Sequence, residues 1–273
     1  MRNVFLAGMV LLCMACNTRK SSPLISAVKR HDMNLIRQSL SDVNTRDIEG
    51  NTPLIWAASM GDRDVLELLL KNHADVNGRN HKGETALSIV SFRGYDTLAA
   101  LLIAAGANVN CANMLKVTPL MYSAGRGDEK IVKLLLENGA HVNAVNREGL
   151  TPLAYAALND RFDIVQLLVQ HHAFVDVIAN EDNSLLNLLA MRGNTKIAQY
   201  LIDNGAPVNG KNKYCDTALM TACKRVKLDM VKLLLDNHAD YNETDDNGET
   251  VLDFAVKIKE KEMIAMLKAA GAK

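Results

Sequence analysis

Large aromatic rings and an excess of charge of either sign are both scarce in this sequence. Phe, Trp and Tyr together make up 4% of the 273 residues, which argues against a core built on large rings. Lys plus Arg equals Asp plus Glu at 31 each, so the formal net charge is zero. Nucleic-acid-binding domains normally show a strong basic excess, and this balance therefore predicts no nucleic acid partner. The 48% of hydrophobic residues still allows a large core to be buried.

Signatures of catalysis and of nucleotide binding are also missing. The sequence contains no G-x-x-x-x-G-K-[ST], no G-x-S-x-G and no H-E-x-x-H motif. It also shows no nucleophile placed with a base, which hydrolysis would need. We therefore expect no enzymatic activity and no cofactor.

An apolar run of twelve residues, from Val4 to Ala15, follows a positively charged start. Twelve residues are too few to span a bilayer, which needs about 20. The pattern predicts a secretory signal peptide over residues 1–15, with the small residue Ala15 before the cleavage site. Cys16 follows directly, which resembles a bacterial lipoprotein signal whose cysteine becomes the lipidated N-terminus; plain secretion is the alternative. We expect residues 16–21 to be a tether and the protein to lie on the periplasmic side of the cell envelope.

One pattern recurs along almost the whole chain at a constant interval of 33 residues. Each copy contains Thr or Ser, then a small or turn residue, then Leu. The seven copies start at Thr52, Thr85, Thr118, Thr151, Ser184, Thr217 and Thr250. A Thr or Ser hydroxyl caps a helix N-terminus, and Pro is favoured at the first helical position. A helix with small residues, a short turn and a helix with one apolar face follow, so each copy predicts a helix-turn-helix unit.

These features resemble the ankyrin repeat family, through D-x-x-G-x-T-P-L, A-A-x-x-G and I/V-V-x-x-L-L-x-x-G-A-x-V-N. The resemblance implies an all-α solenoid of helix-turn-helix units with β-turn fingers. It covers residues 22–273 as a single array, in which a capping unit (22–46) precedes seven repeats (47–272).

Some repeats depart from the family pattern. The turn Gly is replaced by Lys116, Asp182 and Cys215, which leaves the turn geometry open at three fingertips. Repeat five departs most, with Ser184-Leu185-Leu186 in place of T-P-L and Asp176 in place of Asn. Restoring T-P-L there is expected to stabilise the array.

Histidine and cysteine do not form ligand sets. His73, His172 and His238 stand where other repeats end a helix with Gly, and His is enriched at positive φ, so we interpret them as structural. Cys111 and Cys215 would lie about 30 Å apart on stacked helix pairs, whereas disulfides need Cα atoms within about 7 Å.

The two remaining cysteine predictions concern burial. Cys223 falls in a column of small residues and is expected to be buried. Cys215 is expected to be an exposed free thiol, with a redox role as the alternative.

In ankyrin-repeat proteins, partners bind the concave surface formed by the fingertips and the first helices. Aromatic residues four positions after the Thr are therefore candidate anchors, although this column is also commonly core. Those chosen are Trp56, Tyr122 and Tyr155.

An apolar patch is also expected at the middle of this surface. Met114, Leu115 and Val117 are apolar where neighbouring fingertips are charged, and such patches tend to mark binding sites. The alternative is that these side chains fold over one another. The patch is completed by Phe92, Leu150 and Leu158.

Four repeats place an arginine eight residues after the Thr. Arg suits the recognition of carboxylates, so this column could face acidic groups of a partner, or it could be solvated. The four are Arg93, Arg126, Arg192 and Arg225.

Together these features predict a non-catalytic scaffold of the bacterial envelope that binds another protein on its concave face. We expect a monomer that meets the membrane only through its lipid anchor, and a partner with apolar and acidic groups. The alternatives are an immunity or inhibitor protein that blocks a toxin or hydrolase, or a periplasmic protector of an antioxidant enzyme.

Overall fold

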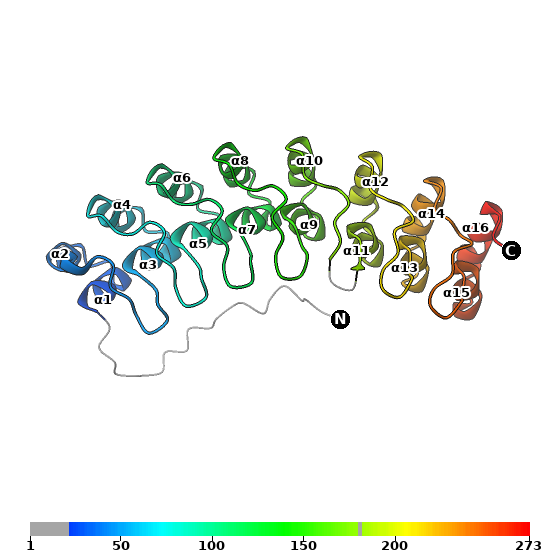
Figure 1. Cartoon of the computed structure of the whole chain (residues 1–273), viewed down its shortest axis with the longest axis horizontal. Helices are drawn as coiled ribbons and strands as arrows, with labels where there is room; N and C mark the ends of the chain where they lie inside the picture. The colour runs from blue at the N-terminus through cyan, green and yellow to red at the C-terminus, as the bar shows by residue number, and fades with distance from the viewer. Residues whose placement is uncertain (1–21, 180–181) are drawn as a thin grey trace.

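The computed structural model describes residues 22–179 and 182–273; the expected signal, the tether and Cys16 lie outside the described residues. The described residues form sixteen α-helices in two layers, with the pairs stacked side by side into an arch (Figure 1). The inner layer and the fingers line the concave side of this arch. Within the described ranges, no helix combines the length and the hydropathy needed to cross a bilayer.

Inner and outer helices alternate along the chain. The inner helices are α1 (Pro23–Lys29), α3 (Pro53–Met60), α5 (Ala86–Arg93), α7 (Pro119–Arg126), α9 (Pro152–Leu158), α11 (Leu185–Arg192), α13 (Ala218–Lys224) and α15 (Val251–Ile258). The outer helices are α2 (Met33–Gln38), α4 (Arg63–Lys71), α6 (Asp96–Ala104), α8 (Glu129–Glu137), α10 (Phe162–Gln170), α12 (Thr195–Asp203), α14 (Leu228–Asp236) and α16 (Lys261–Ala270). A short 3₁₀ helix, η1 (Leu40–Asp42), follows α2.

Each predicted Thr or Ser caps the inner helix of its repeat. The hydroxyl of Thr52 accepts a hydrogen bond from the N–H of Ile55 at 3.2 Å, and Ser184 accepts from Asn187 at 3.1 Å. The same cap is present at Thr85, Thr118, Thr151, Thr217 and Thr250. Because such a cap contributes about 1 kcal/mol, these residues determine where every inner helix of the seven repeats begins.

The core is one continuous cluster of aliphatic side chains that runs from Leu24 to Ala272. Small residues such as Ala57 and Ala58 are fully buried and let neighbouring inner helices approach closely. The outer helices bury only one face, as Val65 and Leu69 do on α4. Aromatic rings contribute little to this core, in agreement with their scarcity in the sequence.

The residues that replace the fingertip Gly keep its left-handed backbone. Lys116, Asp182 and Cys215 have φ of 60°, 55° and 58°, against 78° at the fingertip glycine Gly50. The backbone conformation that the sequence left open is therefore retained at these three positions. A residue with a Cβ is disfavoured in this left-handed conformation by about 1–2 kcal/mol, so the replacements cost stability and leave the shape intact.

The histidines that replace Gly after the outer helices also adopt left-handed backbone. The φ values of His73, His172 and His238 are 62°, 64° and 62°. This confirms the structural interpretation of these three side chains.

A row of asparagines, here called the asparagine ladder, joins the loop after each outer helix to the next repeat. In Asn110, Oδ1 accepts from the N–H of His141 (2.8 Å) and Nδ2 donates to the carbonyl of Gly139 (3.0 Å). Asn77 and Asn143 make the same two bonds to the repeat that follows them. The accepting bond is also present at Asn44 and Asn209. Since repeats contact only their neighbours, each rung helps couple one repeat to the next.

Candidate partner-binding surface

A single side chain shapes the base of most fingers. In repeat three, Asn113 Oδ1 accepts from the N–H of Leu115 (2.9 Å) and of Val117 (3.0 Å). At five other finger bases, the side chain accepts the same two hydrogen bonds, from the N–H groups of the second and fourth residues after it. These side chains are Asp47, Asn80, Asn146, Asn212 and Asp245. Repeat five has Ala179 at this position, which has no side-chain acceptor.

The predicted aromatic anchors hold these finger bases in place. The polar atom of each aromatic side chain is hydrogen-bonded to the side chain of the finger-base residue nine positions earlier, at 2.8 to 3.0 Å. The pairs are Trp56 with Asp47, Tyr122 with Asn113, and Tyr155 with Asn146. Burial raises the pKa of Tyr122 to about 12 and also raises that of Tyr155. All three residues are partly buried, and Trp56 and Tyr155 pack against the core, so the column serves the core as well as the surface.

Three apolar side chains are well exposed near the middle of the array. Phe92, at the end of α5, is 51% exposed, and the fingertip residues Met114 and Leu115 are 60% and 59% exposed. The Phe92 ring packs edge-on against Tyr122, with centroids 5.4 Å apart at 73°. Asn113, next to Met114, binds the hydroxyl of that same tyrosine. We call Phe92, Met114 and Leu115 the central apolar patch.

Backbone hydrogen bonds between fingers fix this patch. The N–H of Met114 donates to the carbonyl of Lys82 at 2.9 Å, and the carbonyl of Leu115 accepts from Arg147 at 3.0 Å. The fingertip of repeat three is thus bonded on both sides. A surface that is already ordered loses less entropy when it binds.

Val117, Leu150 and Leu158 do not belong to the exposed patch, contrary to the sequence prediction. They are only 5%, 6% and 6% exposed. Leu150 and Leu158 stand eight residues apart, where a finger meets its inner helix. The same two positions in repeat six hold the ion pair of Asp216 and Lys224 at 2.6 Å, which shows that side chains there touch. By this equivalence the two leucines lie where a finger meets its inner helix, and both belong to the hydrophobic core.

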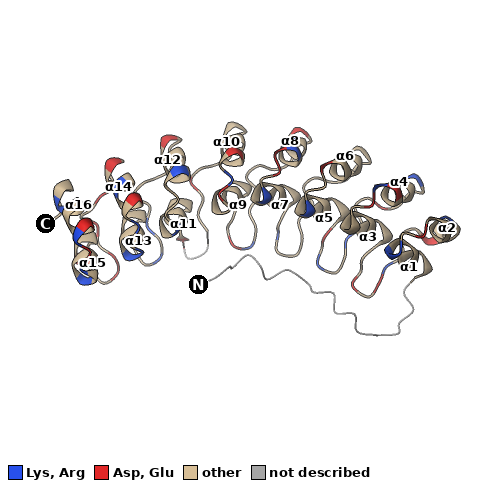
Figure 2. Cartoon of the chain, turned by 180° about the vertical axis from the view of Figure 1, so that it is seen from behind, with Lys and Arg blue, Asp and Glu red and all other residues tan. Residues whose placement is uncertain are grey.

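The four arginines of the predicted column are all exposed, but two already have bonds. Arg126 pairs with Asp128 at 2.6 Å, and Arg192 donates to the carbonyl of Leu158. The side chains of Arg93 and Arg225 form no hydrogen bond or ion pair with any described residue. Figure 2 shows basic bands on α5, α7 and α13 at the edge where the inner helices end.

Comparison with known families agrees with this architecture. The family model described as ankyrin repeats (three copies) matches residues 8–80, 24–113, 87–179 and 186–273. The chain belongs to the ankyrin-repeat family. Ankyrin-repeat proteins are generally non-catalytic interaction modules that bind other proteins. No curated protein matches the sequence significantly.

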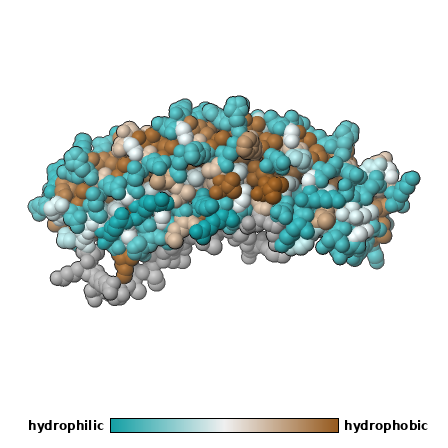
Figure 3. All heavy atoms as spheres, in the orientation of Figure 1, coloured by the Kyte–Doolittle hydropathy of each residue, from teal (hydrophilic) through white to brown (hydrophobic). Residues whose placement is uncertain are grey.

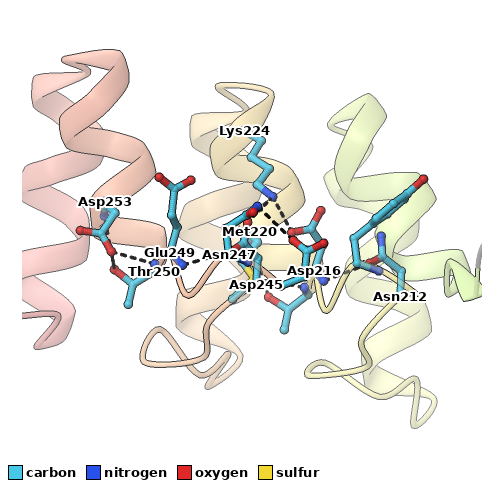
Figure 4. Close-up of polar contacts among 12 residues, drawn as sticks. Asn212, Asp216, Met220, Lys224, Asp245, Asn247, Glu249, Thr250 and Asp253 are labelled. Atoms are coloured by element: carbon cyan, nitrogen blue, oxygen red, sulfur yellow. Dashed lines mark hydrogen bonds and ion pairs between the residues drawn. The ribbon is translucent and has the colours of Figure 1, made fainter.

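One feature of this ankyrin-repeat array was missed by sequence reasoning. Lys224 lies between the carboxylates of Asp216 (2.6 Å) and Asp245 (3.1 Å), as Figure 4 shows. Its Nζ is also 4.4 Å from the centre of the Phe254 ring. At the other end of the array, Lys29 stands over Trp56 beside Asp47, at 3.9 and 4.0 Å. The signal was available, because finger-base Asp stands only after the two inner helices that end in Lys, α1 and α13.

The local electrostatics of the Lys224 cluster favour charged groups. Burial alone would raise the pKa of Asp245, but the N–H groups of Glu249 and Asn247 and the Lys224 ammonium outweigh it and lower that pKa. Burial likewise opposes the charged form of Lys224, yet its two carboxylate partners raise the pKa of the amine. This pattern is that of a structural ion pair.

The described cysteines match the sequence prediction. Cys215 is an exposed free thiol, Cys223 is buried and free, and Cys111 is intermediate. Burial raises the pKa of the Cys223 thiol to about 12, so it is an unreactive packing group in the folded protein. In residues 22–179 and 182–273, no cluster of three His, Cys, Asp or Glu side chains is suited to a metal ion.

Proposed function

We propose that this ankyrin-repeat protein is a non-catalytic scaffold of the bacterial envelope that holds a partner protein on its concave face. The central apolar patch carries the proposal. Its three large side chains are each more than half exposed on a bonded, ordered part of the surface. Apolar anchors near the centre of an interface commonly supply most of the binding energy.

The charges beside the patch suggest what the partner presents. Arg93 follows Phe92 in the chain, is exposed and has no partner among the described residues. An arginine in this state suits a carboxylate, because its planar group can form two parallel hydrogen bonds. We therefore propose a partner segment with an apolar or aromatic side chain flanked by Asp or Glu.

The proposed location rests on the N-terminal sequence. A basic start, a short apolar run and Ala15 before Cys16 support export followed by lipidation at Cys16. The array would then work as a monomer tethered to a membrane by its lipid.

Capture from an envelope extract tests the binding proposal. The mature chain should retain a partner, and Phe92→Ala combined with Leu115→Asp should lose it while the circular dichroism spectrum stays helical. Hot-spot truncations cost about 2 kcal/mol or more, so the loss should be readily measured. Ile48→Asp is the matched control, since Ile48 is an apolar fingertip residue, 65% exposed, outside the patch.

Unchanged capture by the double variant would place the binding face elsewhere and defeat the proposal. The identity of the captured protein separates the finer alternatives. A toxin or hydrolase would indicate an inhibitor, and an antioxidant enzyme would indicate a protector.

A further inference from the structure

The asparagine ladder is interrupted at the junction between repeats four and five. Asp176 stands where the ladder has Asn, and its carboxylate has no N–H to donate to the carbonyl of Gly205. The second bond of the rung would come from the backbone N–H of residue 207, but this residue is Pro, which has no N–H. Neither hydrogen bond of this rung can form. The rungs before and after it, at Asn143 and Asn209, are in place.

The helices at this junction also pack least tightly. Among successive inner helices, α9 and α11 make the least extensive contact. In the outer layer, α10 and α12 contact each other less than the other neighbouring outer helices from α4 onward. On the loop edge, Phe174 and Ile178 before the junction are 68% and 49% exposed. Figure 3 shows apolar surface gathered near the middle of the array on the face it displays.

Among the described residues, the hydrogen bonds that side chains form across this junction lie at the opposite edge, where inner helices turn into outer ones. Arg192 donates to the carbonyl of Leu158, and Asn194 donates to Asp160. On the adjoining outer helices, the Phe162 ring packs edge-on against Tyr200 at 5.5 Å. The junction therefore keeps these contacts at one edge and lacks its asparagine rung at the other.

We propose that this junction is a hinge that divides the array into two blocks, residues 22–178 and 179–273. The blocks pivot on the Arg192 and Asn194 contacts and separate on the loop edge, where the rung is missing. In a solenoid, each repeat is held only by its own stability and its nearest neighbours, so one weak interface uncouples everything on either side. The concave face can thereby change its curvature around a partner.

The full chain carries a native probe in each block. Trp56, the single Trp, reports on repeat one by fluorescence. Cys223, which is 0% exposed on α13, reports on the second block by iodoacetamide labelling, resolved by peptide mass spectrometry. In a urea titration, we expect Cys223 to become labelled before Trp56 loses its native fluorescence, since the second block has fewer repeats. Coincident midpoints would overturn the hinge.

Restoring the missing rung provides a second test of the hinge. Asp176→Asn with Pro207→Ala restores both hydrogen bonds and should slow native-state labelling of Cys223 by roughly tenfold. The control Asp176→Ala with Pro207→Ala removes the same two residues without rebuilding the rung, and it should not slow labelling. Equal rates in the two double variants would contradict the proposal.

Motion is measured by electron–electron resonance between paired nitroxide labels, with exposed native thiols changed to Ser. Labels at Lys133→Cys and Lys232→Cys lie three repeats apart across the hinge. Labels at Glu67→Cys and Gln166→Cys lie three repeats apart within the first block. We expect a wider distance distribution across the hinge, which the rebuilt rung narrows; equal widths would refute the hinge.

Discussion

Lys224 of repeat six reaches the finger base of repeat seven, where its Nζ lies 3.1 Å from a carboxylate oxygen of Asp245. The Asp245 side chain is 1% exposed, so its charge depends on this ammonium and on backbone N–H groups. The interior finger bases use neutral Asn or Ala, and only the first and last repeats use Asp. The finger bases of the first and last repeats are thus each paired with a lysine, Lys29 and Lys224 respectively.

Lys224→Met should destabilise the array by about 1–3 kcal/mol, because it leaves a buried carboxylate without its cation. Lys257→Met is the control, since its ion pair with Glu249 is exposed and should contribute less than about 1 kcal/mol. Adding Asp245→Asn to Lys224→Met should recover much of the loss. Urea unfolding followed by circular dichroism measures all three, and equal effects of the two lysine changes would contradict this account.

Stability of the capping unit should depend on pH through His31. The hydrogen bond to Asp62, followed by the attraction of that carboxylate, raises the pKa of His31. Asp64 adds a smaller attraction of the same sign. When folding raises the pKa of a histidine, the stabilisation is complete at a pH below the pKa of the unfolded state. It is lost as the pH rises through the pKa of the folded state. Trp56 fluorescence should therefore show a lower melting temperature at pH 8 than at pH 6, and His31→Gln should remove this difference.

Leu185→Pro should destabilise repeat five, although it restores the T-P-L pattern. The N–H of Leu185 donates to the carbonyl of Val177 at 2.8 Å, and Pro would delete this bond. Ser184 already caps the helix, so Thr there gains little. We expect a loss of about 1 kcal/mol or more in thermal unfolding. A rise in melting temperature would show that the T-P-L pattern predicts the stability of repeat five better than the loss of this hydrogen bond does.

Lys116→Gly should stabilise the fingertip of repeat three. Lys116 has φ of 60°, where a side chain is disfavoured, whereas Gly adopts this conformation freely. The added freedom of the unfolded chain offsets part of the gain, which leaves about 0.5–1 kcal/mol. The reciprocal change Gly50→Ala should be harmful, because the new Cβ would lie 2.7 Å from the His81 ring. Melting temperatures that move the same way in both variants would disprove this reading.

Cys16→Ser should release the protein from the membrane fraction or block its processing. The lipidated residue of the proposed signal is this cysteine, and Ser cannot form the thioether. Fractionation and mass spectrometry of the N-terminus measure the outcome. A variant that stays membrane-bound and normally processed would remove the lipid anchor from the proposal.

The inner helices of the seven repeats could be predicted from the sequence because each begins at a hydroxyl whose role is local. Thr52 and its equivalents cap the next turn whatever surrounds them, so a constant register sufficed. Burial on the concave face was harder, since it depends on a residue eight positions away. Val117 and Leu158 looked exposed when the fingers were compared alone, and Lys224 was not singled out. Leu158 and Lys224 could be placed only together with the residues eight positions earlier, Leu150 and Asp216.

The contact between finger and inner helix holds two leucines at Leu150 and Leu158 and ion pairs at Asp216–Lys224 and Glu249–Lys257. Repeat two combines Glu84 with Phe92, and there the Glu84 carboxylate accepts a hydrogen bond from Asn80 at 2.8 Å. A single charged replacement therefore needs another polar partner, whereas a paired replacement supplies its own. In descendants of this gene, positions 150 and 158 are expected to covary, and so are 216 and 224, even where the surrounding repeat has drifted freely.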